Sequence, residues 1–128
     1  MNQIKRKILV IEDEADIREN LEELLSEEYE VLVASGGRLG IEIALKEKPD
    51  LVICDVTMAG VTGYNVITAI RANQNTAKTP FIFLSAKVSK EDMRLGMELG
   101  ADDYLTKPYN RKELFSAIAA RFRRFDSQ

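Results

Sequence analysis

Histidine is missing from this 128-residue chain, and cysteine occurs only once, as Cys54. The lack of histidine excludes Ser-His and Cys-His catalysis, metal binding through imidazole, and a role as carrier of a phosphohistidine. One cysteine cannot form an internal disulfide, and its place inside an apolar run is typical of a small core residue. No apolar run is long enough for a signal peptide or a membrane span. We therefore expect a cytoplasmic protein that does not associate with membranes.

An excess of positive charge is also missing. The chain has 18 Lys and Arg against 21 Asp and Glu, a net charge of −3 and a pI of about 5.1. Neither this balance nor the basic residues Arg121, Arg123 and Arg124, which suit a helix C-terminus, indicate a surface for nucleic acid. With 45% hydrophobic and 30% charged residues, the composition is that of an ordinary globular protein. The length predicts a single domain over residues 1–128.

Five short apolar segments predict β-strands, and each is followed by a segment with helical periodicity. The predicted strands are 8–11, 31–34, 51–54, 81–84 and 103–106, with the fourth helix at about 89–99 and the fifth beginning near 110. This alternation predicts an α/β fold, a flavodoxin-like doubly wound five-stranded parallel sheet of order 2-1-3-4-5 with helices on both faces. The segment 51–54 is apolar at every position, which is typical of a strand buried on both faces.

Polar residues follow the predicted strands at their carboxyl ends, which meet at one edge of a parallel sheet. They are Glu12, Asp13, Asp55, Ser85 and Lys107. Three carboxylates held close together repel one another and require a cation, and oxygen ligands without His or Cys favour Mg²⁺ or Mn²⁺. A metal, a hydroxyl and an amine around one acid can stabilise a transferred phosphoryl group, with Asp55 as the nucleophile. Each residue alone also has an ordinary interpretation, because Asp and Ser cap helices and lysines usually lie at the surface.

Four segments carry a resemblance to a known family: 8–14, 49–55, 83–86 and 100–108. In order, spacing and strand-end placement, the chain resembles the receiver domain of two-component response regulators, including the chemotaxis regulators, over essentially its whole length. The resemblance implies that Asp55 accepts a phosphoryl group from the phosphohistidine of a partner histidine kinase or histidine phosphotransfer protein. It also implies that Glu12 and Asp13 hold Mg²⁺, together with Asp55 and the backbone carbonyl of Thr57.

The same resemblance implies a switch. Lys107 would pair with the phosphoryl group, Ser85 would contact it through its hydroxyl, and Tyr104 would turn inward as that hydroxyl moves. The peptide bond between Lys107 and Pro108 would be cis. Phosphorylation adds negative charge and strong acceptor oxygens. We therefore expect it to change the surface formed by the fourth helix, fifth strand and fifth helix, to which a downstream effector protein or domain would bind.

Several positions depart from the family pattern or flank its site. Ala59 replaces a proline of the loop after the acceptor, and Thr57 and Lys87 occupy positions that tune the lifetime of the phosphoryl group. Ala117 replaces an Arg used for dimerisation in one branch of the family, so we expect a monomer or weak dimer, either free-standing or part of a longer protein. No enzymatic activity is expected beyond self-directed phosphotransfer and autodephosphorylation.

Alternative functions are distinguished by the same residues. Acids after the first strand would repel the phosphate of an FMN, and an aspartate-nucleophile phosphatase normally has a second acid where Thr57 stands. The alternative that the sequence leaves open is a pseudo-receiver, a protein-interaction module that is not phosphorylated.

Overall fold

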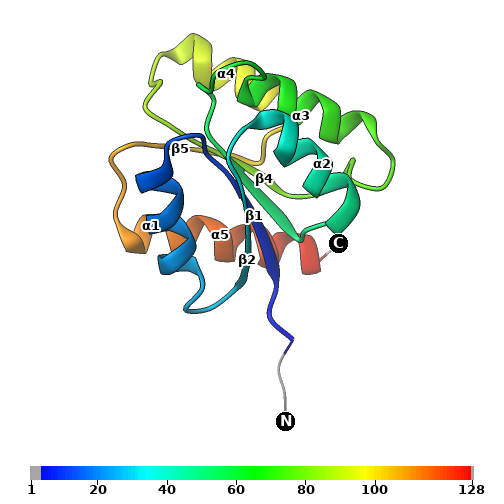
Figure 1. Ribbon diagram of the computed structural model, residues 1–128, viewed down its shortest axis with the longest axis vertical. Coiled ribbons are helices and arrows are strands. Elements are labelled where there is room, and N and C mark those ends of the chain that lie inside the picture. Colours follow the sequence, from blue (N-terminus) through cyan, green and yellow to red (C-terminus); the bar gives the residue numbers. More distant parts are fainter. Residues whose placement is uncertain (1–3, 128) are drawn as a thin grey trace.

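The chain forms a five-stranded parallel sheet between two layers of helices (Figure 1). This architecture comes from a computed structural model that describes residues 4–127. The strands are β1 (Lys7–Ile11), β2 (Glu30–Ala34), β3 (Leu51–Cys54), β4 (Phe81–Ser85) and β5 (Asp103–Thr106). The helices are α1 (Ala15–Leu25), α2 (Gly37–Glu47), α3 (Gly63–Ala72), α4 (Lys90–Glu98) and α5 (Arg111–Asp126).

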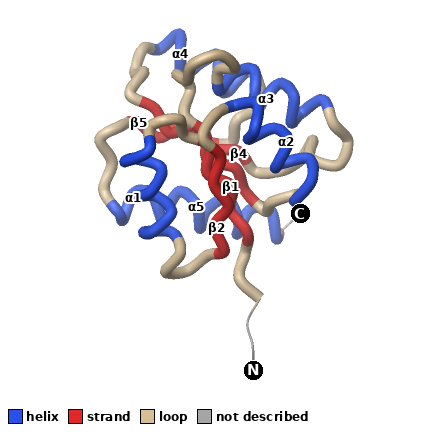
Figure 2. Tube along the Cα trace, viewed as in Figure 1, coloured by secondary structure: helices blue, strands red, loops and turns tan. Residues whose placement is uncertain are grey.

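The strand order is β2-β1-β3-β4-β5, which confirms the predicted order. Helices α1 and α5 cover one face of the sheet, and α2, α3 and α4 cover the other (Figure 2). Each face therefore buries its own apolar cluster, as a parallel sheet requires. Within residues 4–127, none of the helices combines the length and apolarity needed to cross a membrane.

The central strand β3 is buried along its whole length. Leu51, Val52 and Cys54 are completely inaccessible and Ile53 is 1% exposed, which confirms the expected burial on both faces. Strand β3 pairs with β1 on one side and β4 on the other, so the residues that follow these three strands lie side by side.

The loop between β3 and α3 is held close to the strand end by Gly63. A Cβ atom at this position would collide with the backbone carbonyl of Asp55, so only glycine fits without movement of the backbone. Helix α3 then begins with a capping box, in which the Thr62 and Asn65 side chains bond to each other's backbone N–H groups. These local features fix where the chain leaves the carboxyl end of β3.

Candidate functional site

Three strand ends bring Glu12, Asp55 and Lys107 together at the carboxyl edge of the sheet, which we call the acidic edge. The Lys107 Nζ atom lies 3.0 Å from Asp55 Oδ2 and 3.1 Å from Glu12 Oε1. The exposed fractions of these side chains are 19% for Lys107, 11% for Asp55 and 3% for Glu12. One ammonium group therefore binds two largely buried carboxylates, one from the end of β1 and one from the end of β3.

The electrostatics of this cluster are set by burial and by the lysine. Burial raises the pKa of Glu12 above its ordinary 4.5 and the charge of Asp55 adds to the rise, while bonds from Glu14 N and Lys107 oppose it. Burial lowers the pKa of Lys107, but its bonds to Asp55 and Glu12 outweigh burial, so its pKa lies above the ordinary 10.5. Lys107 is therefore a permanent cation at neutral pH, positioned against Asp55.

Asp13 lies beside this cluster but does not cap the following helix. The N-cap of α1 is Glu14, which makes no side-chain capping bond, so the alternative of Asp13 as a cap is wrong. Instead, Asp13 Oδ2 accepts a hydrogen bond from Ala59 N at 3.1 Å, and Asp55 Oδ1 accepts one from Thr57 N at 3.2 Å. The loop after β3 is thus bonded to both acids, and Asp13 remains exposed at the surface of the edge.

The donor atoms at this edge are chemically suited to a hard cation. Asp13, Asp55 and the backbone of Thr57 offer only oxygen, which Mg²⁺ prefers. Among the described residues, no three Asp, Glu, Cys or His side chains are grouped so as to hold a metal ion. Instead of a third acid, the ammonium of Lys107 lies between Glu12 and Asp55. The acidic edge therefore offers oxygen ligands that suit Mg²⁺, and Lys107 bridges two of its carboxylates.

Ser85 and Tyr104, the two residues predicted to act as a switch, are both bonded to the backbone of Lys87. The Ser85 hydroxyl, 1% exposed, accepts a bond from Lys87 N at 3.2 Å. The Tyr104 hydroxyl donates to Lys87 O at 2.9 Å, and its side chain is 7% exposed. The loop between β4 and α4 is therefore held from the end of β4 and from β5. The peptide bond between Lys107 and Pro108 is cis.

Tyr64 makes a further contact in this region and was not identified as a site residue from the sequence. Its hydroxyl lies 3.2 Å from Asp92 O and 3.3 Å from Asp92 Oδ1, in the first turn of α4. Asp92 also accepts a bond from the hydroxyl of Ser89, the residue that caps α4. Burial raises the pKa of Tyr64, so this hydroxyl stays protonated. The signal that could have identified it is a tyrosine in the first turn of α3, whose large buried residues are aliphatic.

Comparison with known proteins agrees with this geometry. The family described as response regulator receiver domain matches residues 8–119. The structure resembles chemotaxis response regulator CheY4 of Vibrio cholerae, with 31% identity, coverage of 91% of this chain and 98% of that chain, and a TM-score of 0.85. For a response regulator receiver domain protein from Clostridium thermocellum, the identity is 32%, the coverage 94% and 97%, and the TM-score 0.88.

A third similar structure belongs to a different type of protein. It is the signal receiver domain of a signal transduction histidine kinase from Syntrophus aciditrophicus, with 29% identity, coverage of 90% of this chain and 88% of that chain, and a TM-score of 0.82. Receiver domains thus occur both in response regulators and within kinases, and the family is one of signalling domains rather than classical enzymes. By the family match over residues 8–119, this chain belongs to the response regulator receiver domains of two-component systems.

Proposed function

We propose that Asp55 accepts a phosphoryl group from the phosphohistidine of a partner histidine kinase or histidine phosphotransfer protein. The observation that carries this proposal is the contact of 3.0 Å between Lys107 Nζ and Asp55 Oδ2, which holds a cation against the acceptor. The chain has no histidine, so the donor belongs to another protein or another domain. Receiver domains of this family interact with histidine kinases and effectors in general, which supports this choice of partner.

In the transfer, a carboxylate oxygen of Asp55 attacks phosphorus. A new O–P bond forms, the N–P bond of the phosphohistidine breaks, and the imidazole leaves with that electron pair and takes a proton from water. The cation of Lys107 offsets the charge that the phosphoryl oxygens bring to the edge. Asp13, Asp55 and the Thr57 carbonyl would hold Mg²⁺, with Glu12 acting mostly through water. The bound ion supplies further charge neutralisation around the phosphoryl oxygens.

The modified edge would then act on the loop before α4. The Ser85 hydroxyl, which now accepts a bond from Lys87 N, would donate its own O–H to a new phosphoryl oxygen and move towards it. The bond from Tyr104 to Lys87 O links the same loop to β5, so a change at Ser85 reaches the surface of α4, β5 and α5. A downstream effector would recognise this surface. We also propose that the protein is cytoplasmic, that it is a monomer or weak dimer, and that residues 1–128 form one domain.

Intact-mass measurement tests the proposal. After incubation with acetyl phosphate and Mg²⁺, wild-type protein should gain one phosphoryl group, which Asp55→Asn and a chelator should each abolish. Asp50→Asn, at the other end of β3, is the matched control and should label normally. An unmodified wild-type chain, under conditions that label a known receiver, would identify a pseudo-receiver instead. Steady turnover of an added phosphomonoester would indicate a phosphatase.

A further inference from the structure

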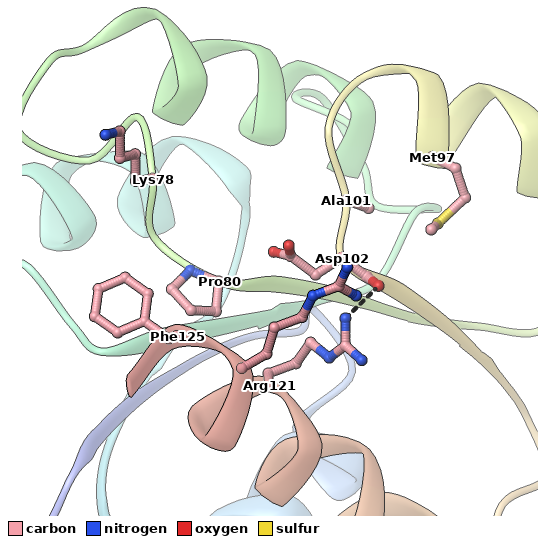
Figure 3. Close-up of a pocket in the computed structure, with 8 residues that line it drawn as sticks. Lys78, Pro80, Met97, Ala101, Asp102, Arg121 and Phe125 are labelled. Atoms are coloured by element: carbon pink, nitrogen blue, oxygen red, sulfur yellow. Dashed lines mark hydrogen bonds between the residues drawn. The ribbon is translucent and has the colours of Figure 1, made fainter. Parts of the chain in front are cut away.

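A cavity of about 370 Å³ lies away from the acidic edge, where α4 ends and β5 begins (Figure 3). Side chains from the last turns of α5 and from the segment before β4 close its other sides. Its lining residues are Lys78, Pro80, Met97, Ala101, Asp102, Arg121, Arg124 and Phe125. Because the cavity lies at the amino end of β5 and Lys107 follows its carboxyl end, this cavity is separate from the acidic edge.

Three cations line this cavity, and none of them forms an ion pair with a carboxylate of the described residues. Among residues 4–127, no Asp or Glu oxygen lies within ion-pair distance of Lys78, Arg121 or Arg124. The one hydrogen bond that Arg121 makes within this range runs from Nη1 to the backbone carbonyl of Asp102, at 3.1 Å. Its Nε atom is buried and has no hydrogen-bond partner in the described part of the chain. A guanidinium has five N–H donors, so most donors of Arg121 have no partner among the described residues.

The carboxylate of Asp102 does not cancel this positive charge, although it also lines the cavity. Its Oδ2 atom accepts a hydrogen bond from Phe81 N at 2.7 Å and lies 3.3 Å from Arg71 Nη2. Arg71 is half-buried and also donates to the carbonyl of Gly100. Asp102 is therefore neutralised by Arg71, and the excess charge of the cavity is positive.

The same cavity has an apolar wall. Met97 is 47% exposed and Phe125 is 45% exposed, so both side chains leave much apolar surface in contact with water. Pro80 and Ala101 are buried behind them. In Figure 3, the ring of Phe125 lies beside Pro80, opposite Met97. A flat apolar group placed here would cover surface that is now in contact with water.

We propose that this cavity binds a small organic anion. The anionic head, a phosphate, sulfonate or carboxylate, would bind to Arg121 and Arg124, and the apolar body would pack against Phe125 and Met97. Arginine suits this role because its planar guanidinium offers paired donors to such oxyanions. A volume of about 370 Å³ falls within the range of small-molecule pockets. This site does not depend on phosphorylation of Asp55.

An NMR titration of the full chain with naphthalene-1-sulfonate tests the site. This probe joins an anion to a flat apolar group and has no phosphoryl group to transfer, so its binding is read independently of the acidic edge. We expect saturable backbone amide shifts in 97–102 and 121–125. Sulfate alone and 1-naphthalenemethanol alone, which each lack one half of the probe, should bind more weakly. No saturable shift, or shifts centred on the acidic edge, would overturn the proposal.

Variants of α5 provide the second comparison. The double variant Arg121→Gln/Arg124→Gln should bind the sulfonate at least about tenfold more weakly, because charge-assisted hydrogen bonds are lost. Arg123→Gln also removes one positive charge from this turn of α5, but Arg123 lines a different pocket. The affinity of this variant for the sulfonate should therefore equal that of wild type. The single variant Arg124→Gln, which alters an exposed side chain, keeps the test valid if the double variant unfolds. Equal affinity in all variants, or dimerisation during the titration, would contradict a small-molecule site.

Discussion

Two lysines at opposite ends of the sheet each lie between two carboxylates, yet their surroundings differ. At the amino end of β1, Lys7 Nζ is 3.8 Å from Glu30 and 3.7 Å from Glu47. Their side chains are 29%, 56% and 37% exposed, in that order. At the acidic edge, Lys107 contacts its two acids at 3.0 and 3.1 Å, and the three side chains are far less exposed.

The two clusters have the same charges, so the difference between them is one of burial and of distance. Exposed pairs contribute about 0–1 kcal/mol and are screened by salt. In the lysine-bridged cluster, by contrast, desolvation opposes attraction, and Glu12 and Asp55 compete for one ammonium. Such a cluster adds little net stability and is poised to accept a further change of charge. In the proposed function, Asp55 at the carboxyl end of β3 is the acceptor, whereas the Asp50 carboxylate at the amino end bonds to the backbone N–H of Lys7.

The largest expected effect is on stability, from Lys107→Gln. Two buried carboxylates would then face each other without their cation, so we expect a loss of about 2–3 kcal/mol in the free energy of unfolding at neutral pH. Lys7→Gln is the matched control and should cost less than about 0.5 kcal/mol. Urea unfolding of both variants measures the two values. Equal losses would show that burial does not distinguish the two ends.

The next effect concerns pH. Because the pKa of Glu12 is raised above 4.5, its ionisation costs stability, and that cost appears as pH rises from 4.5 through the folded-state pKa. The hydrogen bond and the charge of Lys107 both lower the pKa of Glu12. Without Lys107 the folded-state pKa of Glu12 is therefore higher, and the cost of its ionisation extends over a wider pH range. Relative to wild type, the penalty of Lys107→Gln should therefore shrink by about 1 kcal/mol or more between pH 7 and about pH 5. A penalty that is constant with pH would contradict the assigned role of Glu12.

A smaller effect, of opposite sign at the two ends of β3, is expected from replacing its flanking acids. Asp55→Asn should stabilise the fold by about 1 kcal/mol, because Glu12 would keep Lys107 without a competing carboxylate. Asp50→Asn should instead destabilise it by about 0.5–1 kcal/mol, because Asp50 Oδ2 accepts a charge-assisted bond from Lys7 N at 2.7 Å. Thermal unfolding of both variants gives the two signs. Destabilisation by Asp55→Asn would indicate that the acidic edge is a stabilising structure.

The smallest effect is expected at α4. Tyr64→Phe removes only the hydroxyl that contacts Asp92, so the loss of stability should be about 0.5–1 kcal/mol. Hydrogen exchange should accelerate mainly in the first turn of α4. Tyr104→Phe is the comparison: it frees Lys87 O and should accelerate exchange in the loop 86–89 instead. Identical exchange patterns would show that the two tyrosines do not hold separate segments.

Much of this molecule was predictable from local patterns. The apolar run of β3, the alternation of strands and helices, and the polar residues after each strand gave the sheet order and the members of the acidic edge. Pairings between distant segments could not be predicted. The bonds from Tyr64 to α4, from Ala59 N to Asp13 and from Arg71 to Gly100 each join residues 28 or more positions apart. No sequence periodicity records such contacts, because they depend on how the loops close.

Mapping the modified residue tests Asp55 as the acceptor. Wild-type protein treated with acetyl phosphate and Mg²⁺ would be reduced with borohydride, which converts an aspartyl phosphate to homoserine, and then analysed by tandem mass spectrometry. We expect homoserine at position 55, and none at positions 12, 13 or 50. Homoserine at any of those other positions, or at none in a protein that has gained a phosphoryl group, would contradict Asp55 as the acceptor.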